Sequence, residues 1–122
     1  MEIFSFDRGG IAVLINNVAV PAGADYYSDE VGIVASYSGF RLPNSVTWEW
    51  AFGGTGAFST ILILLEGSID GLTWYQLDSS FSVLTSGMQH VMSKPVRYLR
   101  AHIPSTVAIA SGAPTVHVQL TM

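Results

Sequence analysis

The chain has 122 residues, of which 49% are hydrophobic and 11% charged, and it contains no cysteine. This length predicts one domain with a sizeable core, and the lack of cysteine excludes disulfide frameworks, thiol nucleophiles and thiolate metal sites. The net charge of −4 and five scattered Lys and Arg residues argue against binding to nucleic acid, which requires clustered basic groups. The low charge also indicates that part of the surface is buried against other chains.

The N-terminal segment, residues 1–25, predicts either an arm or an edge strand. Ile3, Phe4 and Phe6 are apolar and precede a polar, glycine-containing stretch at residues 7–10. These three side chains are candidate partner contacts. We expect them to dock either on the sheet of their own chain or on the sheet edge of a neighbouring chain. The acidic residue near the start and the interrupted apolar run are atypical of a signal peptide.

Strands are predicted along the rest of the chain by apolar residues that alternate with polar ones. Residues 46–52 and 116–120 show this alternation most clearly, and 61–65 are apolar throughout, as in a central strand covered on both faces or a buried helical turn. Shorter strands are expected at 11–15, 31–37, 73–77, 89–92, 96–103 and 107–110. The pattern predicts a single all-β domain, residues 1–122, that forms an antiparallel β-sandwich of jelly-roll type with little helix.

Two glycine-containing stretches are predicted to connect strands. The GGTG sequence at residues 53–56 lacks a following lysine and helix, so it is interpreted as a connection and not as a phosphate-binding loop. In LEGSIDGLTW, residues 65–74, Asp70 and Gly71 are predicted to form the turn of a β-hairpin, with Asp70 capping the turn and Gly71 at positive φ. Trp74 is then expected on the following strand, where it covers the end of the core.

The segments EGSIDGLTWYQL and KPVRYLRAHI resemble the SxDGxxW and RYxR signatures of discoidin-type carbohydrate-binding jelly rolls. Together with VAVPAGADYYSDEVGI, they are also similar to small β-sandwich virion proteins of tailed bacteriophages, over residues 17–122. The phage resemblance implies a capsid decoration (cement) protein, or another head or tail accessory, that binds the major capsid protein lattice on the virion exterior after synthesis in the host cytoplasm. It also implies a homo-oligomer, with a trimer favoured.

The alternative resemblance implies a carbohydrate-binding module. Its candidate glycan contacts are Trp74, Arg97, Tyr98 and Arg100, because an exposed ring and a guanidinium on one surface can stack on and hydrogen-bond a sugar. The competing interpretation is that Tyr98 packs and that the arginines pair with surface carboxylates. The aromatic residues are interpreted as core filling between the sheets, with one or two left for an interface: Trp48, Trp50, Phe52, Phe58, Trp74, Tyr75 and Phe81.

No catalytic, metal-binding or cofactor-binding motif is found in the sequence. The three histidines, His90, His102 and His117, lack the spacing of a metal site, and no serine lies in a GxSxG motif. The longest apolar runs, such as residues 61–65, are far below the roughly 20 residues that span a bilayer, so no membrane partner is expected. The sequence therefore predicts a structural protein that is not an enzyme and needs no cofactor.

Overall fold

A computed structural model of the protein describes residues 2–5, 11–34, 45–81, 84–94 and 96–121. These residues form ten strands: β1 (Glu2–Ser5), β2 (Ile11–Ala19), β3 (Tyr26–Tyr27), β4 (Val31–Val34), β5 (Ser45–Thr60), β6 (Leu64–Ser68), β7 (Tyr75–Ser79), β8 (Gly87–Met92), β9 (Tyr98–Ile103) and β10 (Ala108–Thr121). The described residues include no helix long and apolar enough to cross a membrane. The predicted all-β class is confirmed.

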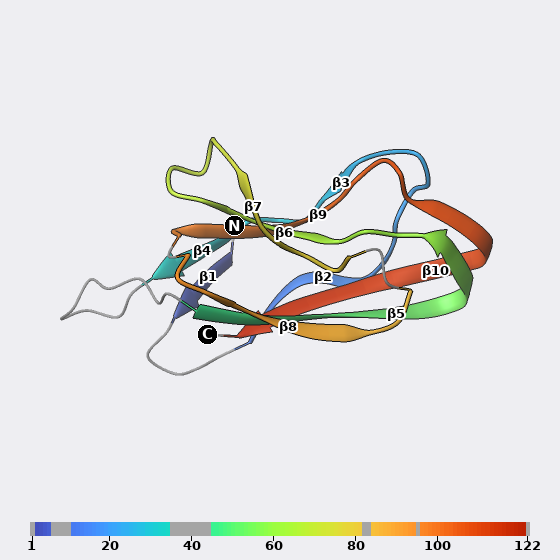
Figure 1. The fold of residues 1–122 in the computed structure, drawn as a ribbon, viewed down its shortest axis with the longest axis horizontal. Coiled ribbons are helices and arrows are strands. Elements are labelled where there is room, and N and C mark those ends of the chain that lie inside the picture. The colour runs from blue at the N-terminus through green and yellow to red at the C-terminus, as the bar shows by residue number, and fades with distance from the viewer. Residues whose placement is uncertain (1, 6–10, 35–44, 82–83, 95, 122) are drawn as a thin grey trace.

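The strands form two sheets that pack face to face (Figure 1). Sheet A has the order β1-β4-β9-β6-β7, with β3 also paired to β9, and sheet B has the order β2-β10-β5-β8. All these pairs are antiparallel except β1 with β4. The β2-β10-β5-β8 sheet opposite β4-β9-β6-β7 is the strand order of a jelly roll, in which the chain repeatedly crosses between the sheets. This confirms the predicted sandwich.

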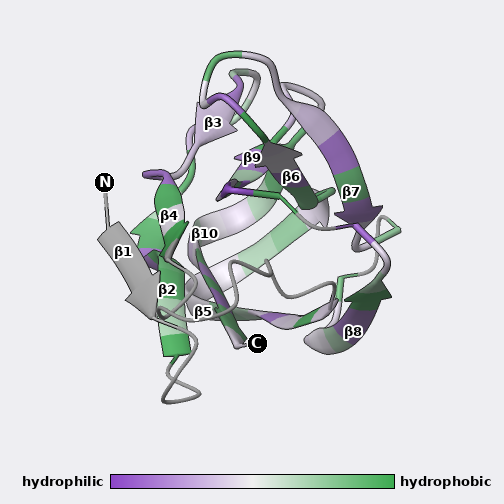
Figure 2. Ribbon diagram, turned by 90° about the vertical axis from the view of Figure 1, so that its left-hand side faces the viewer, coloured by the Kyte–Doolittle hydropathy of each residue, from purple (hydrophilic) through white to green (hydrophobic). Residues whose placement is uncertain are grey.

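The core lies between the sheets, where the strands of both surround a common interior (Figure 2). On β5 the alternation predicted from the sequence places Val46, Trp48 and Trp50 inside, and β10 contributes every second residue from Val116 to Leu120. The indole nitrogen of the fully buried Trp48 donates a hydrogen bond of 2.8 Å to Asp78 Oδ2. Its polar atom therefore keeps a partner while its ring fills the core.

At one end of the sandwich, β5 and β10 turn together from the layer of sheet B toward that of sheet A (Figure 1). Gly54, Gly56 and Gly112 have positive φ at this corner. The prediction that residues 53–56 connect two strands is wrong, because these residues continue β5 and pair with β10. The separate strands expected at 107–110 and 116–120 are likewise one strand, because glycines at positive φ allow paired strands to bend without ending.

Several side chains differ from the core assignment made from the sequence. Trp48, Trp50 and Phe58 are buried and Phe52 is half-buried, but Tyr75 and Phe81 are exposed. Trp74 precedes β7 instead of lying on it, and its ring covers Arg100 instead of the core end. The strand expected at 61–65 begins only at Leu64, and Leu62 and Leu64 are half-buried, so it is not covered on both faces. Aromatic residues in a hairpin can cover polar neighbours as well as a core.

The N-terminal segment lies partly within the sandwich. The backbone of β1, which includes Ile3 and Phe4, pairs in parallel with β4 at the edge of sheet A of its own chain. Phe6 lies outside the described residues, as do residues 35–37 of the strand predicted at 31–37. β2 follows as an edge strand of sheet B. Of the two expectations for residues 1–25, the edge strand is the one the backbone adopts in residues 2–5 and 11–19.

Candidate functional site

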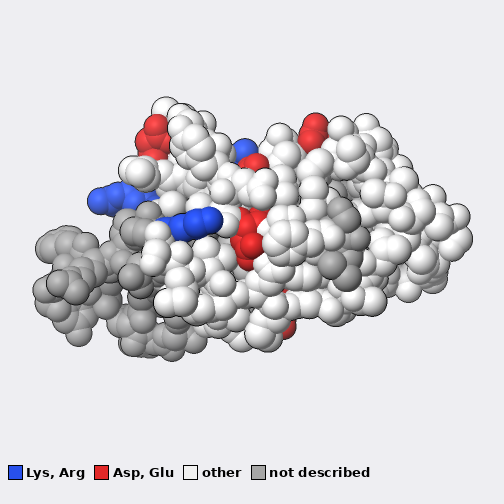
Figure 3. Space-filling view, viewed as in Figure 1, with Lys and Arg blue, Asp and Glu red and all other residues white. Residues whose placement is uncertain are grey.

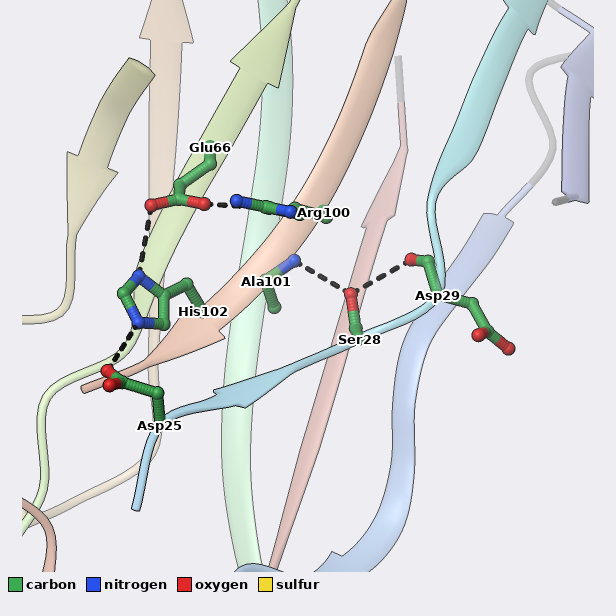
Figure 4. A network of polar contacts seen from close by, with 7 residues as sticks. All are labelled: Asp25, Ser28, Asp29, Glu66, Arg100, Ala101 and His102. Carbon is green, nitrogen blue, oxygen red and sulfur yellow. Dashed lines mark hydrogen bonds and ion pairs between the residues drawn. The ribbon is translucent and has the colours of Figure 1, made fainter. Parts of the chain in front are cut away.

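Charged side chains gather on the outer face of sheet A, at the centre of the sheet (Figure 4). Glu66 on β6 lies opposite Arg100 on β9 in the strand register. Its carboxylate accepts a hydrogen bond of 2.8 Å from Arg100 Nε and lies 3.0 Å from Nδ1 of His102. Asp25, just before β3, lies 2.9 Å from Nε2 of the same imidazole. Four charged or ionisable groups from three chain segments therefore form one network.

The geometry of this network limits what His102 can do. Each of its ring nitrogens faces a carboxylate oxygen, Nδ1 that of Glu66 and Nε2 that of Asp25, so both nitrogens are engaged in contacts within the protein. The two carboxylates bond opposite sides of the ring, and the described residues contain no cluster of His, Asp and Glu arranged to hold a metal ion.

The same network attaches the segment before β4 to the sheet. Ser28 Oγ accepts a hydrogen bond of 2.8 Å from the backbone nitrogen of Ala101, and Ser28 N donates one of 2.9 Å to the Ala101 carbonyl. Tyr27 stacks on the ring of His102, with centroids 4.3 Å apart and planes at 16°. Backbone, ring and charge contacts thus combine to hold β3 against β9.

Arg100 connects the network to the loop between β6 and β7. Its guanidinium carbon lies 4.4 Å from the ring centroid of Tyr27 and 4.2 Å from that of Trp74. Cations over aromatic faces are attracted by the ring quadrupole, most strongly for Trp. Arg100 therefore contacts two rings and one carboxylate at once, and these contacts tie Trp74, at the end of the loop, to β9.

The loop itself, residues 69–74, is held by hydrogen bonds to two side chains. Asp70 Oδ1 accepts bonds from the backbone nitrogens of Leu72 and Thr73 at 2.8 and 2.9 Å, and Ser68 Oγ accepts one from Gly71 N at 2.9 Å. These backbone bonds, together with the bond from Ser68, lower the pKa of Asp70 below its ordinary value of 3.8. Gly71 has φ +78°. The predicted hairpin turn, with Asp70 capping and Gly71 at positive φ, is confirmed.

The structure brings together three of the four candidate glycan contacts. Trp74 lies over Arg100, and Tyr98, half-buried at the start of β9, lies beneath the loop at Gly71. Arg97 is exposed, and its backbone bridges β6 and β4 through bonds to Ser68 O and Ile33 N. The SxDGxxW and RYxR motifs are therefore two halves of one packed unit, in which Arg100 pairs with Glu66 as the second interpretation expected.

Sequence reasoning missed the roles of Glu66, His102 and Asp25. A signal was present, because Arg100 and His102 alternate on one strand and so share a face, and Glu66 is the one charged residue in the apolar strand that precedes the loop. The register that places Glu66 opposite Arg100 depends on how β6 and β9 align across a separation of 34 residues. Asp25 is brought in only by the crossover to β3.

In comparisons with known proteins, no family model matches this chain, and no curated protein is similar to it in sequence.

Proposed function

We propose that the protein is a non-enzymatic structural component of a tailed-phage virion, a capsid decoration protein that binds the lattice of the major capsid protein. The jelly-roll sandwich and the resemblance of its sequence motifs support this proposal. The charged residues on sheet A are also consistent with a structural role, because Glu66 bonds to both Arg100 and His102 within the protein. Their contacts join the loops to the sheet and stabilise the fold.

The observation that carries the proposal is the apolar surface. Eleven large hydrophobic side chains among the described residues are more than a third exposed: Ile11, Val13, Tyr27, Ile69, Leu72, Tyr75, Phe81, Leu84, Met88, Met92 and Ile109. Scattered exposed hydrophobics are normal in any protein, but such a number in a chain with 11% charged residues indicates surfaces that are covered in an assembly. Assembly on a shell and self-association, as a trimer by resemblance, both provide such cover.

A decoration protein of this kind stabilises a shell by mass action. It binds the assembled lattice and not the dissociated subunits, so its binding free energy adds to the work needed to expand or burst the shell. No bond is made or broken in this mechanism. It requires only a rigid fold and surfaces complementary to the lattice.

The test is binding to shells assembled from the major capsid protein of the parent particle. We expect the purified protein to sediment with intact shells, but not with dissociated subunits, and to raise the temperature at which the shells burst. Light scattering of the free protein measures its oligomeric mass, which is three chains if the resemblance is correct. Absence of shell binding would contradict the proposal, and a specific hit on a glycan array, abolished by Tyr98→Ala in a folded variant, would favour the carbohydrate-binding alternative.

A further inference from the structure

The loop between β6 and β7 is polar in its internal contacts but apolar at its tip. Ile69 is 72% exposed and Leu72 is 84% exposed, so neither side chain contributes to the core. The side chains of Asp70 and Ser68 fix the loop backbone by accepting hydrogen bonds of 2.8 to 2.9 Å from its nitrogens. The loop projects from the body of the sandwich (Figure 1). Two large aliphatic side chains are thus held out in solvent by a loop whose conformation is already fixed.

An apolar hollow lies directly beside this tip. It has a volume of about 440 Å³. Its wall is formed by Ile69, Asp70, Thr73, Tyr75, Leu77 and Val96, together with Gly67 and Ser68 at the end of β6. Tyr75 is itself 68% exposed. A projection next to a hollow is a shape that a folded partner can match with a recess and a ridge of its own, whereas a fluid surface has no such shape.

Charged side chains of both signs lie around the hollow: the Asp70 carboxylate is in its wall and is bonded to the loop backbone, and two cations lie at its border. Lys94 and Arg97 flank Val96, and neither forms an ion pair with a described residue. Lys94 donates a hydrogen bond to the Leu77 carbonyl, and Arg97 is exposed. Arg100, by contrast, is neutralised by Glu66. On the face shown in Figure 3, basic side chains lie toward the end that carries the loop, where acidic atoms are also visible, and the other end shows no basic side chain.

We propose that this loop-tip surface, formed by Ile69, Leu72, Tyr75, Leu77 and Val96 and bordered by Lys94 and Arg97, docks into an apolar recess rimmed by carboxylates on a partner protein. The inference rests on the proposed function, which makes that partner the major capsid protein of the shell. Because the loop is fixed before binding, docking orders little chain and more of the apolar contact is retained as affinity. Lys94 and Arg97, which form no ion pair with a described residue, match a rim of opposite charge.

A lipid surface fits these observations less well. Ile69 and Leu72 together present eight aliphatic side-chain carbons, well below the roughly 14 carbons of a myristoyl chain, which by itself binds membranes only marginally. Two cations add about 1 kcal/mol each at an anionic membrane. These contributions to membrane binding are small. A fluid membrane also has no fixed shape that would fill the hollow lined by Tyr75, Leu77 and Val96.

The experiment compares three variants of the full chain for binding to shells of the parent particle's major capsid protein. Ile69→Ser with Leu72→Ser removes the apolar tip. Ala57→Ser with Ala110→Ser is the control, because both alanines are exposed but lie on β5 and β10, away from the loop. Lys94→Glu with Arg97→Glu reverses the charge of the border. Thermal unfolding verifies each fold, and vesicles containing anionic phosphatidylserine test for a lipid partner.

We expect the tip variant to bind shells at least about tenfold more weakly than the wild type, and the control to bind within about twofold. The charge-reversed variant should bind more weakly and lose the salt dependence of the wild type.

If the tip variant binds as well as the wild type while the control loses binding, the inference is wrong and the proposed function stands. If the wild type does not bind shells, the proposed function is wrong and this partner assignment falls with it. Binding of the wild type to vesicles, lost in the tip variant, would replace the protein partner with a membrane.

Discussion

At one end of the sandwich, β5 and β10 turn together around the core, whereas at the other end the chain projects as the β6–β7 loop (Figure 1). Both ends depend on glycines at positive φ. At the corner, a Cβ built on Gly56 would lie 2.0 Å from the Ser111 carbonyl oxygen, but one built on Gly71 in the loop meets nothing closer than the Tyr98 ring at 3.6 Å. The corner needs glycine for space as well as for φ, and the loop needs it for φ alone.

The two ends also differ in what stabilises them. The corner is held by main-chain pairing between β5 and β10 and presents small, exposed side chains such as Thr55, Ala57 and Ser111. The loop is held by side chains, with Asp70 and Ser68 bonding its backbone and Trp74 tied to Arg100. We infer that the corner serves the stability of the fold, while the loop is a separately built element whose tip is available to a partner.

The largest effect is expected at the corner, from Gly56→Ala. This change combines strain at φ +75° with a clash against backbone that cannot move without breaking the β5–β10 pairing, and it should lower the free energy of unfolding by about 3 kcal/mol or more. Gly23→Ala is the matched control, because Gly23 also has φ +75° but open space around its Cα, so only about 1 kcal/mol is expected. Chemical denaturation measures both, and equal losses would show that the corner is not tightly packed.

The next effect concerns the side chains that join the loop to the sheet. Arg100→Ala removes the partner of Glu66 and uncovers the rings of Tyr27 and Trp74, so a loss of about 2 kcal/mol is expected. Arg97→Ala should change stability by less than about 0.5 kcal/mol, because Arg97 is exposed and forms no ion pair with a described residue. If both variants lose the same stability in thermal unfolding, the network around Arg100 does not hold the loop.

A smaller loss is expected from Gly71→Ala in the loop. The added methyl group meets the Tyr98 ring at an ordinary contact distance, so only the strain of positive φ remains, about 1 kcal/mol. The ratio between this loss and that of Gly56→Ala measures the difference between the two ends. A loss as large as that at the corner would mean that the loop is packed as tightly as the core.

The smallest effect is a change in stability at low pH that comes from Asp70 in the loop. The pKa of Asp70 is lowered in the folded chain, so its carboxylate stabilises the protein above the ordinary value of 3.8, and this contribution is lost as the pH falls through the lower, folded value. Asp70→Asn, whose side-chain oxygen can still accept hydrogen bonds but does not ionise, should flatten this part of the curve of unfolding midpoint against pH. An unchanged curve in the variant would show that Asp70 does not bond the loop in solution.

The sequence predicts the sandwich and the hairpin well because both depend on local patterns. Alternation at residues 46–52 and 116–120 and the Asp70-Gly71 pair each determine structure within a few residues. The corner was not predicted, because a glycine-rich stretch such as residues 53–56 looks the same in the sequence whether it ends a strand or bends one that continues. The network of Glu66, Arg100 and His102 depends on the register between β6 and β9, which is set by packing of the whole sheet.

Amide hydrogen exchange measures whether the β6–β7 loop is fixed in the free protein. The amides of Leu72 and Thr73 lie on an exposed loop but donate to Asp70 Oδ1, so we expect their exchange to be slowed at least about tenfold relative to an unstructured chain. In Asp70→Ala this protection should disappear from both amides while that of the buried Val118 on β10 remains. Exchange of the Leu72 and Thr73 amides at the unstructured rate in the wild type would show that the loop is not fixed before a partner binds.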